Sequence, residues 1–460
     1  MVQPNERTIL IQRNATSYTG DNTKPRRVVV LDVFRGLLMV LQSLDHARSF
    51  LTALTEHETW YSQPVYKDLV PSISRLVTHL AAPGFAFMMG FGIILFSESR
   101  LRIGWEINKL LKHYIIRGLT LLILNAYFMI FGIIYVIDYI IFPTTVLFAL
   151  GINFIIGGLV FLAGIKSFPY LVRFQQNFNS NYTVDYENVE KKAKYMRNVI
   201  LLLITILLAI GNVSQTPKSI EYETVDFGLW RFIWLLPGEY KWLFSMYPPL
   251  NWLSFTIFGI LYGYITLKQA HNKRYNRNLN LKIGIFLLTL FLAIRIPGKF
   301  GNINPELLPS PPPGTLFNNP YLTSILQFVN AIKYPPDLSF ITLYMGLNHL
   351  ILAFFYSIPS STPYSILNYF IDFLFSGPLL AFGQSALFFY MVHFHLYLIM
   401  GLILTFLFGS NQEPPYSIDS WQFWSMWIFG LALLWPMCIK YAKFKNYFTF
   451  LMSCLQLYYN

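Results

Sequence analysis

The chain has 460 residues, of which 55% are hydrophobic and only 12% are charged. Soluble globular proteins carry about twice that charged fraction, so the composition excludes an ordinary soluble fold. The net charge of +12 does not indicate nucleic-acid binding, because the lysines and arginines lie in alternate loops between apolar blocks.

The apolar blocks are each about twenty residues long and predict an all-α, polytopic transmembrane helical bundle of about ten spans. The predicted spans are residues 28–52, 73–97, 115–134, 143–165, 196–213, 247–267, 281–297, 335–357, 384–408 and 421–440. Basic residues occur in the N-terminal tail, in every second loop and after the last span. Because basic loops face the cytoplasm, we expect both termini there.

This pattern divides the chain into a cytoplasmic N-terminal tail (1–27), a transmembrane domain (28–440) and a cytoplasmic C-terminal tail (441–460). Residues 364–383 are apolar enough to cross, but another crossing would break the alternation of loop charge. We expect an interfacial or re-entrant helix there. The two cysteines, Cys438 and Cys454, define no disulfide framework, and the sequence predicts no metal site.

The first predicted span is unusually polar. Its polar and charged residues include Asp32, Arg35, Gln42, Ser43, Asp45, His46 and Arg48. At 100° per residue, the members that share one face are Asp32, Arg35, Gln42, Ser43 and His46, in a stripe about 21 Å long. An ionisable group in lipid costs about 2.5–3.5 kcal/mol, so this stripe needs partners or a wet cavity. Packing pairs such as Asp32–Arg35 are one interpretation, and a site reached from both sides of the membrane is the other.

Histidines and cations converge at the expected outer ends of the spans. The residues at this level are Asp45, His46 and Arg48, Arg75 and His79, Arg295 and Lys333. A neutral imidazole, with a pKa of about 6.5 when free, can serve as a general base, a nucleophile or a proton relay. His393 is a further candidate, whereas His349 is expected to be a packing residue with no evident partner.

Four motifs occur in a fixed order between residues 31 and 395. They are LDVFRGL (31–37) with LDHAR (44–48), THLAAPGF (78–85), KYPPDLSF (333–340), and the block from Pro378 through FFY (388–390) to His393. Together they resemble the heparan-alpha-glucosaminide N-acetyltransferase catalytic family. Members of that family are multi-pass acyltransferases, and the lysosomal one moves acetyl from cytosolic acetyl-CoA to a terminal glucosamine on the luminal side.

The resemblance implies an acyl-CoA donor, in the first instance acetyl-CoA, and a sugar or amino-sugar acceptor on the outer side. It implies donor-binding roles for Asp32, Arg35, Arg117 and His393, and acceptor-binding roles for Arg48, Arg75, Lys333 and His57. It also implies catalytic roles for His46, His79 and Asp45. A histidine would take a proton from the acceptor or carry the acetyl group itself, and an arginine or lysine would stabilise the oxyanion or the CoA phosphates.

Three residues depart from the family pattern: Gln384 replaces a common Arg, Asp337 replaces Ser, and His79 replaces the Asp of the lysosomal enzyme. The histidines His46, His79 and His57 compete for the catalytic role, and we rank them in that order. The alternative to an acyltransferase is a multi-pass solute transporter whose histidines relay protons, and a third possibility is a fold that has lost its chemistry. The expected partners are the lipid bilayer and a second copy in a homodimer, with no nucleic acid.

Overall fold

The structure is a computed structural model. It describes residues 28–52, 58–62, 68–136, 142–178, 186–217, 227–311, 313–314, 318–359, 362–409 and 416–458, except for the side chains of 128–136, 178, 446 and 448–458. His57, one of the predicted site residues, lies outside the described residues.

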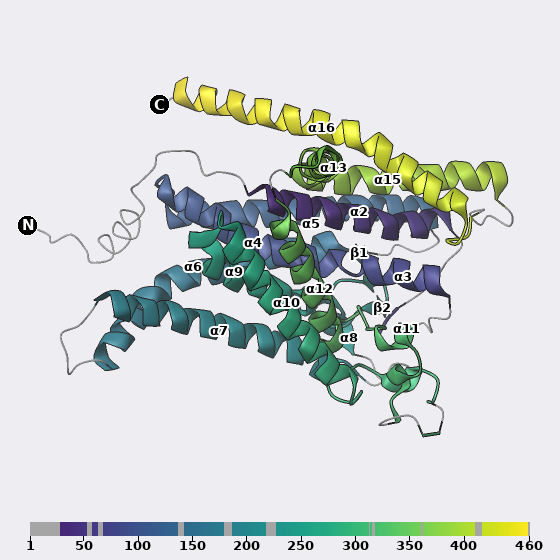
Figure 1. The fold of residues 1–460 in the computed structure, drawn as a ribbon, viewed down its shortest axis with the longest axis horizontal. Coiled ribbons are helices and arrows are strands. Elements are labelled where there is room, and N and C mark those ends of the chain that lie inside the picture. The colour runs from purple at the N-terminus through teal and green to yellow at the C-terminus, as the bar shows by residue number, and fades with distance from the viewer. Residues whose placement is uncertain are drawn as a thin grey trace, which may run out of the picture.

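Long helices account for all ten predicted spans. They are α2 (Val29–Leu51), α3 (Leu69–Thr78) with α4 (Ala81–Arg102), α5 (Ile107–Val136), α6 (Val146–Phe178), α7 (Tyr186–Gln215), α9 (Pro249–Thr266), α10 (Lys273–Arg295), α12 (Leu338–Ser357), α15 (Ala386–Phe408) and α16 (Trp421–Tyr458) (Figure 1). Across the described ranges, nine helical segments are long and apolar enough to cross a membrane. They include eight of these ten predicted spans, all except α2 and α5, and also the segment Ser365–Gln384. The prediction of an all-α polytopic bundle is confirmed, and the chain is a multi-pass integral membrane protein.

The polar helix α2 also has the length of a span. Its 23 residues extend about 35 Å, which exceeds the roughly 30 Å of a hydrocarbon core. It begins toward the same side of the bundle on which α16 ends (Figure 1). This arrangement is the one expected if both termini face one side of the membrane. Helix α16 also continues through the expected C-terminal tail as far as Tyr458.

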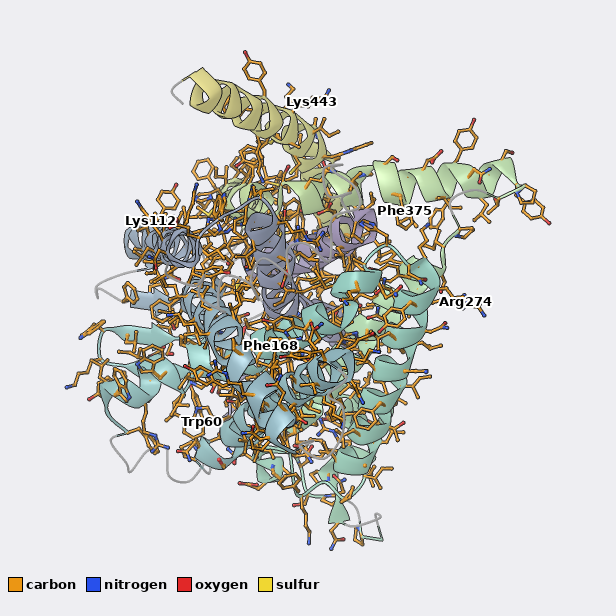
Figure 2. All side chains as sticks on the ribbon, turned by 90° about the vertical axis from the view of Figure 1, so that its left-hand side faces the viewer. Trp60, Lys112, Phe168, Arg274, Phe375 and Lys443 are labelled. Carbon is orange, nitrogen blue, oxygen red and sulfur yellow. The ribbon has the colours of Figure 1, made fainter. Side chains whose placement is uncertain are left out.

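The apolar segment 364–383 does not form one straight helix. It forms α13 (Ser365–Ser376) and α14 (Pro378–Gln384), which are separated at Gly377. Helix α13 is seen end-on in Figure 1 and lengthwise in Figure 2, where it extends sideways beyond Phe375. The 12 residues of α13 alone span about 18 Å, although Ser365–Gln384 as a whole is long and apolar enough to cross a membrane. A helix lying crosswise to the spans has the shape predicted for an interfacial or re-entrant segment.

Short elements gather where the sequence predicts the outer loops. Strands β1 (Phe142–Thr144), β2 (Gly238–Tyr240) and β3 (Leu243–Ser245) form a small sheet in the order β1-β3-β2, with β1 parallel and β2 antiparallel to β3. Helices α8 (Gly228–Trp234) and α11 (Ile325–Phe328) and the 3₁₀ turns η3 (Pro305–Leu307) and η5 (Pro320–Leu322) complete this region, and η2 (Leu267–Gln269) follows α9.

Glycines allow the helices that carry the site to approach closely. A Cβ atom at Gly383 of α14 would overlap the Asp32 carbonyl of α2, and one at Gly90 of α4 would overlap the Thr256 carbonyl of α9. Only glycine permits such contact between helix backbones. Gly90 thus lets α4 approach α9, and Gly383 lets α14 approach α2.

Candidate functional site

His46 and His393 form a hydrogen-bonded pair between α2 and α15. His46 Nδ1 lies 2.9 Å from His393 Nε2, His393 Nδ1 lies 2.8 Å from the Phe389 carbonyl, and Gln42 Nε2 lies 3.0 Å from His46 Nε2. A carbonyl only accepts, so His393 Nδ1 carries its proton and His393 Nε2 accepts from His46 Nδ1. The free lone pair of His46 is then on Nε2, where the Gln42 amide donates to it. The backbone thus sets the tautomers of both rings.

A network of four charges lies beside this pair. Arg75 of α3 donates from Nε (3.1 Å) and Nη2 (3.0 Å) to Glu58 Oε2, and its Nη1 is 3.3 Å from Asp45 Oδ1. The Lys333 ammonium lies 3.8 Å from Asp45 Oδ2, and the Lys333 backbone N–H donates to Glu58 Oε1 at 2.8 Å. Two carboxylates and two cations therefore balance. Such balance is necessary because removing charges from water is costly.

His79 is tied down at both ring nitrogens. Its Nε2 is 3.0 Å from Glu58 Oε2, and its Nδ1 is 3.1 Å from the Tyr344 hydroxyl of α12. A carboxylate accepts, so Nε2 carries the proton and Nδ1 accepts from Tyr344. The side chain is 1% exposed. His79 is therefore a link between the first outer loop and α12. Of His46 and His79, the two ranked catalytic candidates within the described residues, His46 is the one whose lone pair faces a partner that a substrate could replace, the Gln42 amide.

Lys333 is held against two tyrosine rings. Its ammonium lies 5.7 Å from the Tyr247 ring centroid and 5.0 Å from that of Tyr334, and Tyr334 donates to the Tyr247 hydroxyl at 2.9 Å. Cation–π contacts with such rings stabilise a desolvated ammonium. Burial raises the pKa of Tyr247 well above its usual value, so this phenol remains neutral beside the lysine.

Glu58 is ionised although its side chain is fully buried. Burial alone would raise the pKa of this carboxyl group, but His79, Arg75 and Lys333 together outweigh that effect and lower the pKa to about 2. Trp60, two residues further, is fully buried and donates its indole N–H to the Pro237 carbonyl at 2.9 Å. This anchor fixes the loop that delivers Glu58.

The structure brings together most of the predicted site residues. They form two groups that meet at neighbouring positions of α2: His46 pairs with His393, and Asp45 pairs with Arg75 and Lys333, with His79 joined through Glu58. Arg48 is buried three positions after Asp45. His393 was predicted on the donor side, but its contact is with the proposed catalytic His46.

The other predicted donor-side residues, Asp32, Arg35 and Arg117, lie apart from this cluster. Asp32 and Arg35 pair with each other at 3.3 Å, as the packing interpretation predicted. Arg35 precedes His46 by 11 positions on α2, which is about 16 Å along the axis. Arg117 is exposed on α5, where its guanidinium carbon lies 5.6 Å from the Phe154 ring centroid.

Glu58 is the residue that sequence reasoning missed. It belongs to the His57-Glu58-Thr59-Trp60 segment, of which the sequence analysis considered only the histidine. Trp60, two residues after Glu58, could have indicated its burial, because a large aromatic residue in a short polar loop anchors that loop in the core.

Two further residues have structural roles. Asp337, the departure from Ser in the family pattern, caps α12 by accepting from the Phe340 N–H at 2.6 Å. Either residue type can cap a helix, so this change retains the local function. His349 does have a partner, contrary to expectation: its Nδ1 lies 2.7 Å from Asn280 Oδ1 of α10.

Fold and site together define a multi-pass helical membrane protein with a buried, charge-balanced histidine cluster. Among the side chains in the described part of the chain, no group of three or more His, Cys, Asp or Glu is arranged to hold a metal ion. Comparison with known protein families and with curated protein sequences finds no match for this chain. The functional proposal therefore depends on the chemistry of the site and on the motifs that contribute to it.

Proposed function

We propose that the protein is a membrane acyltransferase that moves an acyl group from cytosolic acyl-CoA to a sugar or similar acceptor on the opposite side of the membrane. The observation that carries the proposal is the hydrogen-bonded series from the Phe389 carbonyl through His393 to His46, beside the buried Lys333. Each of the four motifs that resemble the heparan-alpha-glucosaminide N-acetyltransferase catalytic family supplies at least one residue to this cluster.

In this mechanism His46 is the general base. An acceptor hydroxyl or amine replaces Gln42 at His46 Nε2, which takes the acceptor's proton as its oxygen or nitrogen attacks the thioester carbonyl. The tetrahedral intermediate collapses, the C–S bond breaks, and the imidazolium returns the proton to the leaving thiolate. The products are the acylated acceptor and free CoA thiol, so protons and electrons balance.

Lys333 supplies the electrostatic stabilisation. The thioester oxygen becomes negative in the transition state, and a fixed cation in a site with little water stabilises it far better than a solvated one. Lys333 is 1% exposed and its partner Asp45 is 16% exposed, so the water-accessible side of this ion pair is the carboxylate. Asp45 is the ion-pair partner that holds the Lys333 side chain beside the position preceding His46 in this proposal.

The test uses detergent-purified full-length protein and acetyl-CoA. Calorimetry should detect micromolar binding of acetyl-CoA, and Arg35→Ala should weaken it. A thiol reagent should detect CoA release in the presence of glucosamine, and His46→Ala should abolish this release while folding normally. If neither acetyl-CoA nor acyl-CoA of any longer chain bound at up to millimolar concentration, the proposal would be overturned.

The transporter alternative predicts a different result in the same preparation. Proteoliposomes would accumulate labelled solute in the absence of CoA, and His46→Ala would alter the pH dependence of uptake. The acyltransferase predicts that label from acetyl-CoA appears only in the acylated acceptor.

A further inference from the structure

Basic side chains follow one face of α5 near its expected cytoplasmic end. Lys109, His113 and Arg117 occur at intervals of four residues, so they are neighbours on the helix surface. We call these three residues the basic ladder. It extends about 12 Å along the helix axis. Lys109 and Arg117 are exposed, and His113 is half-buried.

Aromatic rings of the adjacent helices hold the basic ladder in place. The His113 ring stacks on the Phe96 ring of α4, with centroids 4.2 Å apart. The Arg117 guanidinium carbon lies 5.6 Å from the Phe154 ring centroid of α6, and Lys109 Nζ lies 4.7 Å from the centroid of Trp105. Cation–π contacts of this kind attract the charge. They leave the N–H groups of the cations available to an oxygen acceptor.

Arg100 joins the basic ladder from α4. Its guanidinium carbon lies 5.0 Å from the Phe96 ring centroid and 5.1 Å from that of Trp105, the same two rings that contact His113 and Lys109. Arg100 Nε is buried and has no hydrogen-bond partner among the described residues. A buried donor without an acceptor is costly, so an acceptor is expected beside this guanidinium.

The positive charge of this region is not balanced by the protein. Within the described ranges, no carboxylate forms an ion pair with Arg100, Lys109 or Arg117. Glu98 interacts electrostatically with cations of α7 instead, and Glu106 is exposed to solvent. The region therefore complements an anion from outside the chain.

The position of Arg117 indicates where that anion comes from. Arg117 lies inside the predicted span 115–134, beside the exposed apolar side chains of Ile116 and Ile123. The preference of cytoplasmic loops for cations accounts for Lys109 and Lys112 at the start of α5, but not for a cation within the span. An arginine that faces lipid needs an anionic partner, and its long side chain can extend toward the phosphates of the membrane surface.

We propose that the basic ladder and Arg100 bind the phosphate head group of an anionic phospholipid in the cytoplasmic leaflet. Anionic lipids are abundant in that leaflet, and basic sites at the ends of membrane-spanning helices bind their head groups. The planar guanidinium groups of Arg100 and Arg117 match phosphate oxygens in geometry as well as in charge. This assignment gives Arg117 a lipid in place of the donor that the family resemblance implies, and it does not depend on acyl transfer.

The test compares the binding of phosphatidylglycerol and phosphatidylcholine, matched in chain length, to detergent-purified full-length protein by native mass spectrometry. We expect wild type to prefer phosphatidylglycerol. Arg117→Gln should reduce that preference about fivefold, the contribution of one cation near an anionic head group. Lys109→Gln should have a similar effect and serves if Arg117→Gln does not fold.

The matched control is Arg274→Gln. It removes an exposed cation that is expected on the same side of the membrane, and Figure 2 shows Arg274 at the edge of the bundle opposite Lys112. The control should retain the wild-type preference. Equal binding of the two lipids by wild type, or an equal loss of preference in the control, would overturn the inference.

Competition separates a lipid head group from soluble sources of phosphate. Inorganic phosphate and acetyl-CoA should each leave phosphatidylglycerol bound, and Lys109→Gln should leave the affinity for acetyl-CoA unchanged. Displacement of the lipid by inorganic phosphate would assign the site to a soluble anion and overturn the inference. Displacement by acetyl-CoA, with weaker acetyl-CoA binding by Lys109→Gln, would assign it to the donor and also overturn the inference. Lipid preference without acyl transfer would overturn only the proposed function.

Discussion

The molecule contains two buried histidine clusters that differ in charge. His349 lies between α9, α10 and α12, where Asn280 donates to the Tyr262 hydroxyl at 2.8 Å. The rings of Phe87, Phe258 and Tyr262 lie within 5.6 Å of the His349 ring. The hydrogen-bonding partners in this cluster are uncharged. His46, in contrast, directly follows Asp45, which pairs with Arg75 and Lys333, and Arg75 in turn pairs with Glu58.

The two clusters differ in the electrostatic cost of burying their polar groups. A neutral network fixes the packing of helices at little electrostatic cost, because its groups satisfy one another. Four buried charges cost several kcal/mol to desolvate, and apolar residues would stabilise the fold at least as well. Charges near the first histidine and neutral partners at the second are the arrangement expected if the first has the proposed catalytic role, and the Asp45 side chain gives that cluster its contact with solvent.

The sharpest test of this comparison exchanges each histidine for alanine. His46→Ala should lower the rate of acyl transfer by about 100-fold or more, because general-base catalysis contributes roughly 10²–10⁴-fold. His349→Ala should leave the rate within a few-fold and lower the melting temperature instead. Acyl transfer is followed with labelled acyl-CoA, and unfolding is followed by a thermal melt in detergent. A rate loss shared equally by both variants would remove the distinction between the clusters.

A second test removes the central carboxylate of the charged cluster. Glu58→Ala leaves Arg75 and the Lys333 N–H without their main acceptor, and we expect the free energy of unfolding to fall by about 3–5 kcal/mol. Glu58→Gln keeps an acceptor for that N–H and should lose less. The measurement is denaturant unfolding in mixed micelles, with Glu187→Ala as control because the Glu187 side chain is 75% exposed. Equal effects at positions 58 and 187 would contradict the burial argument.

The neutral cluster should respond more weakly. Tyr262→Phe removes the hydroxyl that accepts from Asn280, and the expected loss is about 1 kcal/mol, the usual net value of one hydrogen bond. The exposed Tyr195→Phe should have no effect. Both are measured in the same unfolding assay. A loss at Tyr262 as large as that of Glu58→Ala would mean that charge is not what distinguishes the two clusters.

The sequence predicts the spans well because hydrophobic block length and helix length obey the same constraint of bilayer thickness. It also draws attention to His46, an ionisable residue within an apolar helix, and to Lys333, a cation just before the predicted span 335–357. The sequence does not predict which helix faces contact each other. The contact of His46 with His393 joins residues 347 positions apart, and no periodicity within α2 or α15 specifies which faces meet.

The sequence also fails to predict which loop residues are buried in the core. The Lys333 backbone N–H donates to Glu58, although the two residues are 275 positions apart in the sequence. In the sequence, Glu58 resembles any other acidic residue of an outer loop. Its burial depends on Trp60 docking against Pro237, a tertiary contact. For the same reason His349 was expected to have no partner, since Asn280 lies on a different helix.

The charged cluster should also differ from the neutral one in its pH dependence, which Glu58 confers. Its pKa falls from 4.5 to about 2 on folding, so the folded state favours the ionised form. Its contribution to stability is complete above about pH 4.5 and is lost as the pH falls toward 2. The difference in melting temperature between wild type and Glu58→Gln should therefore shrink progressively as the pH falls from 6 to 3. The difference between wild type and Tyr262→Phe should stay constant over the same range, because the Asn280–Tyr262 hydrogen bond joins two groups that remain neutral there. If the melting temperatures of wild type and Glu58→Gln differed by the same amount at every pH, Glu58 would not be held ionised by its neighbours. The contrast between a charged and a neutral histidine cluster would then lose its electrostatic basis.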